Sequence, residues 1–169
     1  MVKIKVTKEM KDEALEYSTL SQNYTSRRHD FHEGGANNAA PKMNEGKIGE
    51  KAFRFWLERE GIPYNEDKTS FKKPDDYDFI INGYRIDVKT RTEKFHTRTL
   101  EMVEQFKNRP KDIYVSVHYH RNTETVDLIG FISSKDLLNL NQIENQGYMN
   151  NYVAYDNQLN SMEDFKKIF

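Results

Sequence analysis

The sequence predicts an α/β domain of the α+β kind, with a central mixed β-sheet of four to five strands flanked by helices. Three observations lead to this prediction. YDFIINGYRIDVKT (77–90) places Asn82-Gly83 between two segments of alternating apolar and polar residues, which is typical of a β-hairpin. IYVSVHYH and TVDLIGFIS read as two further strands joined by a polar turn. NEGKIGEKAFRFWLEREG carries apolar residues at helical spacing.

The N-terminal elements are predicted from composition and from punctuating residues. Residues 8–20 have helix-forming composition, and a long polar loop rich in Ser, Asn and Gly follows and is closed by Pro41. The strongest helix of the chain is then expected to begin with Asn44 as its cap and to end at Gly61. Its apolar stripe is predicted to contain Ile48, Ala52, Phe55 and Trp56.

The elements after the hairpin follow the same signals. A short helix is expected around 99–107, followed by strands over 113–120 and 125–133. Either Ser133 or Ser134 is expected to cap the helix KDLLNL, and a C-terminal helix is expected to begin near Ser161.

Length and composition indicate one domain, heavily charged on its surface. The 169 residues divide into an N-terminal helix and loop (1–43), a core (44–138) and a C-terminal extension (139–169) expected to pack on the same domain. The formal net charge is -1, so any site for a polyanion must arise from local clustering. The absence of cysteine excludes disulfides, thiolate zinc sites and thiol nucleophiles. With neither a signal-peptide core nor a membrane-length apolar run, we expect a cytoplasmic protein that does not contact membranes.

The hairpin brings acidic residues together. A two-residue turn pairs Ile81 with Tyr84 and Asp78 with Asp87, which places the two carboxylates side by side on one face. Like charges in that arrangement repel each other, and a divalent cation such as Mg²⁺ offsets the repulsion most completely. Lys89 lies on the same face, where it can orient or deprotonate a water next to such an ion. This combination suits hydrolysis of a phosphodiester.

In this arrangement the chain resembles the PD-(D/E)XK nuclease superfamily, which has the restriction-endonuclease-like fold. KPDDYDFIINGYRIDVKT is similar to the strand pair of that family, and GKIGEKAFRFWL is similar to the helix before it. YVSVHY and VDLIGFISSKDLL resemble the later strands and helix of Holliday-junction-resolvase-like and Mrr-like members. The likeness covers roughly residues 44–138.

The resemblance implies a Mg²⁺-dependent DNA endonuclease, in which Mn²⁺ can substitute for Mg²⁺ and two copies form a homodimer that cuts both strands. Asp78, Asp87 and the carbonyl oxygen of Val88 would bind the metal, Glu50 would bind it directly or through water, and Lys89 would be the catalytic lysine. Asp75 and Asp76 are alternatives to Asp78, although only Asp78 lies within the predicted strand.

A basic stretch directly follows the proposed lysine and is a candidate for contacts with DNA phosphates. The candidate nucleic-acid-binding residues are Thr90, Arg91, Lys94 and Arg98, with Arg27 and Arg28 as a second, separate pair.

Simpler interpretations remain beside these. Asp87 and Lys89 can form an ion pair on an exposed strand face, and Glu50 can be a solvated helix acid paired with Arg54. His118 and His120 alternate on one strand face and are expected to lie on a partly exposed surface without a third metal ligand, and His29 and His32 to be loop residues. At the level of function, the alternatives are a non-catalytic nucleic-acid-binding or protein-interaction module with the same fold, and a hydrolase of small phosphoesters with a deep pocket.

Overall fold

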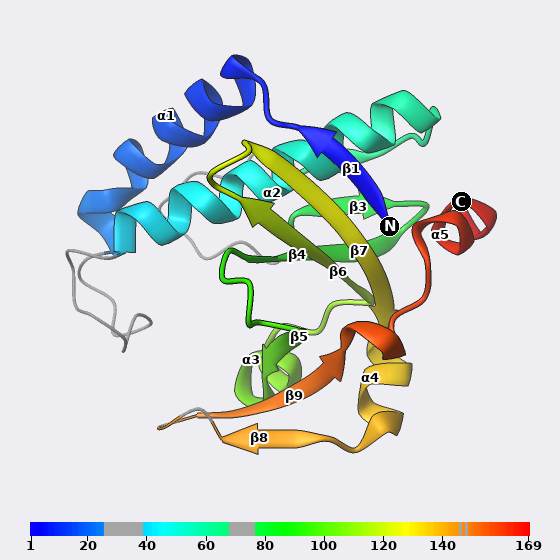
Figure 1. The fold of residues 1–169 in the computed structure, drawn as a ribbon. Helices are drawn as coiled ribbons and strands as arrows, with labels where there is room; N and C mark the ends of the chain where they lie inside the picture. Colours follow the sequence, from blue (N-terminus) through cyan, green and yellow to red (C-terminus); the bar gives the residue numbers. More distant parts are fainter. Residues whose placement is uncertain (26–38, 68–76, 146, 148) are drawn as a thin grey trace.

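The computed structural model of the chain describes residues 1–25, 39–67, 77–145, 147 and 149–169. In these residues two β-sheets form, one of six strands and one of three, together with five α-helices. Figure 1 shows the six-stranded sheet beside the long helices α1 and α2, with the smaller sheet at the lower end of the view. The predicted combination of a mixed sheet with flanking helices is confirmed, but the main sheet is larger than the four to five strands expected.

The main sheet has the order β1-β7-β6-β4-β3-β2. Strands β4 and β6 pair in parallel, and all its other neighbouring strands are antiparallel. The strands are β1 (Val2–Lys5), β2 (Asn65–Glu66), β3 (Phe79–Ile81), β4 (Tyr84–Arg91), β6 (Ile113–His120) and β7 (Thr125–Ser133).

Helix α2 packs on the main sheet and brings the candidate residue Glu50 near β4. Its buried residues Ile48, Phe53 and Trp56 share one apolar core with β4, β6 and β7. None of the helices in the described residues is both long and apolar enough to cross a bilayer. The helices are α1 (Lys8–Thr25), α2 (Ala39–Glu60), α3 (Val103–Asn108), α4 (Ser134–Leu140) and α5 (Met162–Ile168).

The turn between β3 and β4 has the conformation that its sequence favours. Asn82 and Gly83 both have positive φ, 48° and 83°, as a type I′ turn requires. Ile81 consequently pairs with Tyr84, as predicted. Strand β3 is shorter than the predicted strand 77–81, and Asp78 lies one residue before it.

The second sheet has the order β5-β9-β8, and it corrects one prediction. The helix expected around 99–107 is wrong in its first half, because Thr99 to Met102 pair with β9 and only the residues from Val103 onward are helical. The strands are β5 (Arg98–Met102), β8 (Ile143–Asn145) and β9 (Asn150–Tyr155).

Helix boundaries agree with the predictions at the serine caps and differ elsewhere. Ser133 accepts a hydrogen bond from the N–H of Asp136 (3.0 Å), and Ser161 accepts one from that of Asp164 (3.2 Å). Asn44 is not a cap, because α2 begins at Ala39 and keeps Pro41 within its first turn, where a missing N–H is tolerated. Helix α1 likewise continues to Thr25, past the predicted end at residue 20.

The apolar face of α2 also differs from the predicted stripe. Phe53 is fully buried, whereas Phe55 is 41% exposed. Phe53 packs against Trp56, and both contact Phe165 of α5 at ring-centroid distances of 5.8 and 5.6 Å. The C-terminal helix therefore contributes to the same core as α2.

Gly49 lets α2 approach β4 closely. A Cβ at Gly49 would lie 2.1 Å from Thr90 Oγ1 and 2.9 Å from Val117 Cγ2, whereas one at Gly46 would meet nothing within 4 Å. Thr90 Oγ1 also donates a hydrogen bond to the carbonyl oxygen of Gly46 (3.3 Å). This contact holds Glu50 over the strand that carries Asp87.

The two glycines make a matched pair of substitutions. Gly49→Ala is expected to lower the free energy of unfolding by about 1–3 kcal/mol, because the new methyl group overpacks the interface between helix and sheet. Gly46→Ala is expected to raise it by about 0.5–1 kcal/mol, because alanine is the better helix former and the space is open. Urea unfolding of both variants measures the difference. Equal effects would show that the close approach at Gly49 is not sterically required.

Candidate functional site

Asp78 and Asp87 lie next to each other where β3 begins. The Asp78 N–H donates to the carbonyl oxygen of Ile86 (2.9 Å), and Asp78 Oδ2 accepts from the N–H of Val88 (2.7 Å). Just before β3 begins, the Asp78 carboxylate thus accepts the hydrogen bond from β4 that a carbonyl group of a neighbouring strand would otherwise accept. The two acids therefore lie together on the side of β4 that faces β3, as the register of the turn predicted.

The charges around Asp78 are not balanced. Its removal from water raises the pKa of Asp78 well above its usual value, and the nearby carboxylates of Glu50 and Asp87 raise it further. Lys47 and the Val88 N–H lower it only in part. Glu50 itself pairs with Lys47 (2.7 Å), and Arg54, the alternative partner considered from the sequence, pairs instead with Glu13. Two acids, Glu50 and Asp87, thus lie near the Asp78 carboxyl group, which binds a proton unusually well.

Lys89 forms ion pairs with two acids that lie in different sheets. Its Nζ lies 2.9 Å from Asp87 Oδ2 and 2.5 Å from Glu101 Oε2, on β5. The Glu101 side chain is only 1% exposed, and neither of its oxygens makes a hydrogen bond of normal geometry. Burial alone would lower the pKa of Lys89, but Asp87 and Glu101 hold it well above its usual value.

Lys89 is therefore an ammonium at neutral pH. It can orient a water or a phosphate oxygen by donating hydrogen bonds, whereas acting as a base would require the loss of Asp87 or Glu101 as partners. Burial tends to raise the pKa of Asp87, but Lys89 and Lys111, whose Nζ lies 3.8 Å from Asp87 Oδ1, keep it below its usual value.

Sequence reasoning missed Glu101 and Lys111. Glu101 lies in the segment predicted to be helical, and its proximity to Lys89 depends on how β5 packs against the main sheet. Lys111 is buried although it lies in a polar connection before β6. No local pattern marks either residue.

The predicted phosphate-binding residues fall into separate groups. Arg91 is engaged with Asp156 through both terminal nitrogens, and Arg98 pairs with Glu144 (2.8 Å). Lys94 is exposed in the connection between β4 and β5. Arg27, Arg28, His29 and His32 lie outside the described residues, as do Asp75 and Asp76.

The fit of a metal ion depends on Asp78, Asp87 and Glu50. In the described residues no three His, Cys, Asp or Glu side chains form a ready-made metal site. The donors present are nevertheless carboxylate oxygens, the type that Mg²⁺ prefers. The charge excess at Asp78 is also of the kind that a divalent cation relieves. The residue types therefore suit Mg²⁺, and their side chains would have to reorient to bind one ion together.

Asp78→Asn tests this charge excess through stability. Because the folded-state pKa of Asp78 is raised, its carboxyl group contributes stability at low pH that is lost as the pH rises towards that pKa. In EDTA at pH 7.5 we expect Asp78→Asn to raise Tm by a few degrees, where each kcal/mol corresponds to roughly 2–4 °C. Mg²⁺ should raise the Tm of the unsubstituted protein but not that of the variant.

The exposed Asp12, paired with Lys8 at 2.8 Å, provides the control. Asp12→Asn should change neither Tm nor its response to Mg²⁺ by more than a degree or so, as expected for a surface ion pair. A lower Tm for Asp78→Asn in EDTA would mean that the ionised Asp78 carboxylate stabilises the fold.

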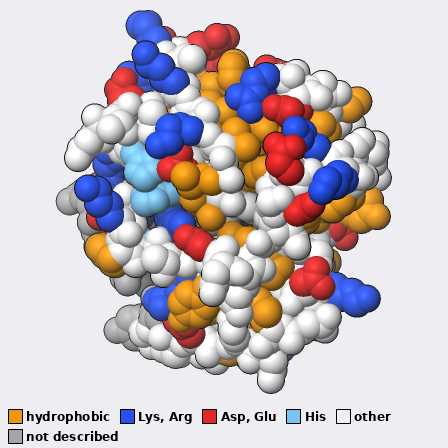
Figure 2. Space-filling model, turned by 45° about the vertical axis from the view of Figure 1, so that its right-hand side comes forward, with side chains coloured by type: hydrophobic (Ala, Val, Ile, Leu, Met, Phe, Trp, Pro, Cys, Tyr) orange, Lys and Arg blue, Asp and Glu red, His pale blue; other side chains and the backbone are white. Residues whose placement is uncertain are grey.

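His118 and His120 lie side by side on one face of β6, as their alternation suggested, but His118 is buried and not on the partly exposed surface expected. Their ring centroids lie 4.1 Å apart, and His120 Nε2 lies 2.8 Å from Asp127 Oδ2 on β7. Lys3 of β1 pairs with the same aspartate (3.4 Å). Burial lowers the pKa of His118, and the neighbouring His120 lowers it further. Figure 2 shows histidine side chains gathered beside Lys, Arg and acidic side chains on one face.

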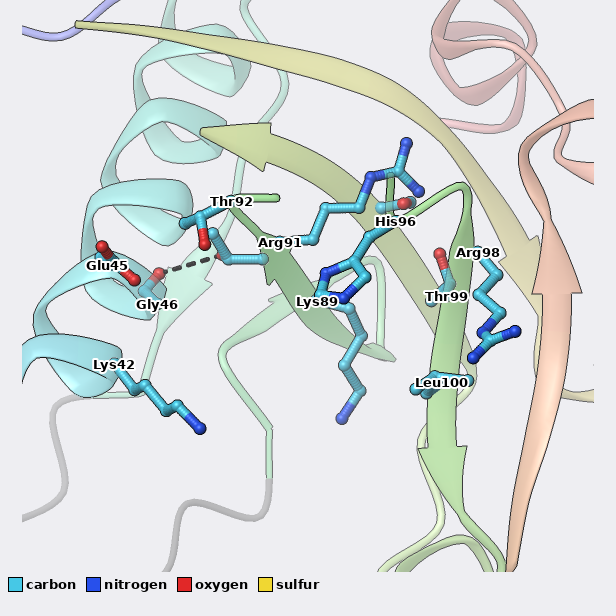
Figure 3. Close-up of a pocket in the computed structure, with 12 residues that line it drawn as sticks. Lys42, Glu45, Gly46, Lys89, Arg91, Thr92, His96, Arg98, Thr99 and Leu100 are labelled. Atoms are coloured by element: carbon cyan, nitrogen blue, oxygen red, sulfur yellow. Dashed lines mark hydrogen bonds between the residues drawn. The ribbon is translucent and has the colours of Figure 1, made fainter. Parts of the chain in front are cut away.

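A cavity of about 330 Å³ opens beside Lys89, between the N-terminal part of α2 and strand β5. Figure 3 shows Lys42 extending from α2 towards this space, with Lys89, His96 and Arg98 also drawn around it. The cavity thus shares Lys89 with the acidic cluster. Arg91 and Arg98 of the basic stretch predicted from the sequence also line the cavity.

Comparison with known proteins adds no further assignment, because no protein-family model, curated protein or solved structure matches the chain.

Proposed function

We propose that the chain is a metal-dependent DNA endonuclease with a restriction-endonuclease-like fold. The observation that carries this proposal is the arrangement at one edge of β4, where Asp78 is held against the Val88 N–H beside Asp87 and Lys89 lies 2.9 Å from Asp87. Two acids and an ammonium brought together by one hairpin are groups suited to phosphodiester hydrolysis with Mg²⁺.

Each residue has a role that its surroundings support. Asp78 and Asp87, with Glu50 and the Val88 carbonyl oxygen, would hold the ion. When bound, Mg²⁺ supplies positive charge at the phosphate and lowers the pKa of a coordinated water. Lys89, kept as an ammonium by Asp87 and Glu101, donates hydrogen bonds that orient the attacking water or a phosphate oxygen.

The topology supports the proposed fold. The two key acids lie on a hairpin whose second strand, β4, pairs in parallel with β6, and α2 covers the sheet next to them. Catalytic groups on strand ends are held more rigidly than groups on loops, and this favours a site at this position.

One observation favours the non-catalytic alternative. Lys89 already pairs with Asp87 and Glu101 without a metal ion, which is an arrangement that a purely structural ion-pair network also adopts. A binding module with this fold would keep that network and bind nucleic acid without cutting it.

Incubation with supercoiled plasmid distinguishes the two. We expect nicked and linear DNA to appear with Mg²⁺ or Mn²⁺ and to be absent with EDTA. DNA that stays supercoiled under all metal conditions, together with a gel shift, would support the binding module instead. Light scattering of the same sample measures whether the chain forms the homodimer that cutting of both strands favours.

A further inference from the structure

The cavity beside Lys89 is lined by more basic than acidic side chains. Its lining carries four Lys and Arg side chains against one acid, Glu45, although the chain as a whole has a net charge of -1. Three of these cations, Lys89, Arg91 and Arg98, already pair with acids outside the lining, so they are held in position and partly neutralised. The four cations are Lys42, Lys89, Arg91 and Arg98.

A second observation also indicates a ligand in this cavity. Thr99, which lines it, is 5% exposed, and its Oγ1 has no hydrogen-bond partner. The Nε of Arg91, whose side chain is 9% exposed, also lacks one. Buried polar atoms of this kind normally have a partner, in the protein, in ordered water or in a bound ligand. A phosphate or a sugar oxygen would supply one.

An aromatic side chain lies next to the cavity. Phe95, in the connection between β4 and β5, is 76% exposed and packs edge-on against His96, with ring centroids 4.5 Å apart. His96 in turn lines the cavity. Figure 3 shows His96 next to the strand that carries Arg98. The adjacent Lys94 is also exposed, so the connection combines a cation with a stacking surface.

We propose that this cavity, together with Phe95 and His96, binds an unpaired nucleotide of a single-stranded nucleic acid. The cationic wall takes the phosphate, and the base stacks on the aromatic pair. A base that stacks on Phe95 and His96 must first leave the stack of a duplex, so an unpaired nucleotide fits this arrangement. The proposal rests on the proposed function in one respect, because it places this strand next to the bond to be cut at Asp87.

Binding without metal tests the proposal separately from cleavage. Fluorescence anisotropy in EDTA compares three labelled probes: a dT 12-mer, an rU 12-mer and a 20-base-pair DNA duplex. We expect the single strands to bind at least tenfold more tightly than the duplex. Phe95→Ala is expected to weaken binding of the single strands about tenfold, because a stacked base is lost.

Matched variants distinguish this site from general charge. Phe55→Ala removes another exposed phenylalanine, on α2, and should leave binding unchanged. Thr99→Val removes the unpartnered hydroxyl group and should weaken binding of the single strands several-fold without lowering Tm, because the free protein loses no hydrogen bond.

The outcomes separate the two proposals. A duplex that binds as tightly as the single strands, or a Phe95→Ala variant that binds them normally, would overturn the single-strand site even if plasmid is cut. Binding of single strands that depends on Phe95, in a protein that never cuts plasmid, would support the site and reject the nuclease. Preference for the dT or the rU probe identifies the strand as DNA or RNA.

Discussion

Replacement of Asp87 by asparagine is expected to lower the rate of Mg²⁺-dependent plasmid cleavage by roughly 10²–10⁴-fold, the range typical of a lost charged group at a reacting phosphate. Asparagine keeps the size of the side chain but removes the negative charge that Lys89 and the proposed ion require. Lys89 keeps Glu101 as its partner, so the fold should persist. Rates of nicking, measured beside the thermal unfolding curve, separate lost activity from lost structure.

Asp12→Asn is the matched control, because it removes one carboxylate charge from an exposed ion pair in α1. It should cut plasmid at the normal rate. If Asp87→Asn also cuts normally while still folded, the site assignment is wrong and any activity resides elsewhere. If both variants are slow, the loss of cleavage is not specific to Asp87, and the site assignment fails.

Local signals were sufficient for the hairpin and for several helix ends. Asn82-Gly83 determines the β3–β4 turn because few other dipeptides adopt positive φ at both positions. Ser133 and Ser161 are recognisable because their side chains satisfy N–H groups three residues later. Asp78, Asp87 and Lys89 belong to this local category, since one turn brings them together.

Other features depend on contacts distant in the sequence. Residues 98–102 have the composition of a helix, but pairing with residues 151–155 makes them a strand. Strand β1 was not predicted at all, because its four residues become a strand only by pairing with β7. Propensity is a weak guide where tertiary pairing decides.

In the candidate site too, some residues could be identified from local sequence and others only from distant contacts. The acids and the lysine of the hairpin could be identified from their spacing, but the partners that determine their protonation could not. Glu101 and Lys111 reach Asp87 and Lys89 only after β5 and the segment before β6 have packed against the hairpin. The conclusion that Lys89 is a fixed ammonium therefore required the structure.

Lys89→Met is expected both to destabilise the protein and to abolish cleavage, and a second substitution separates the two effects. Without the ammonium, Asp87 and Glu101 are left as neighbouring carboxylates, one of them 1% exposed. Removing one partner of such a pair lowers the free energy of unfolding by about 3 kcal/mol or more. Lys8→Met, in a pair where Lys8 is 87% exposed, should change it by less than about 1 kcal/mol.

The double variant Lys89→Met, Glu101→Gln should recover most of the lost stability, because glutamine removes the unpaired buried charge while methionine fills the space of the lysine stem. Urea unfolding measures this recovery. If Lys89 orients the reacting groups, the double variant stays inactive although it is folded. Renewed cleavage in the double variant would mean that Lys89 serves only to neutralise Glu101, and that Asp78 and Asp87 bind the metal without its help.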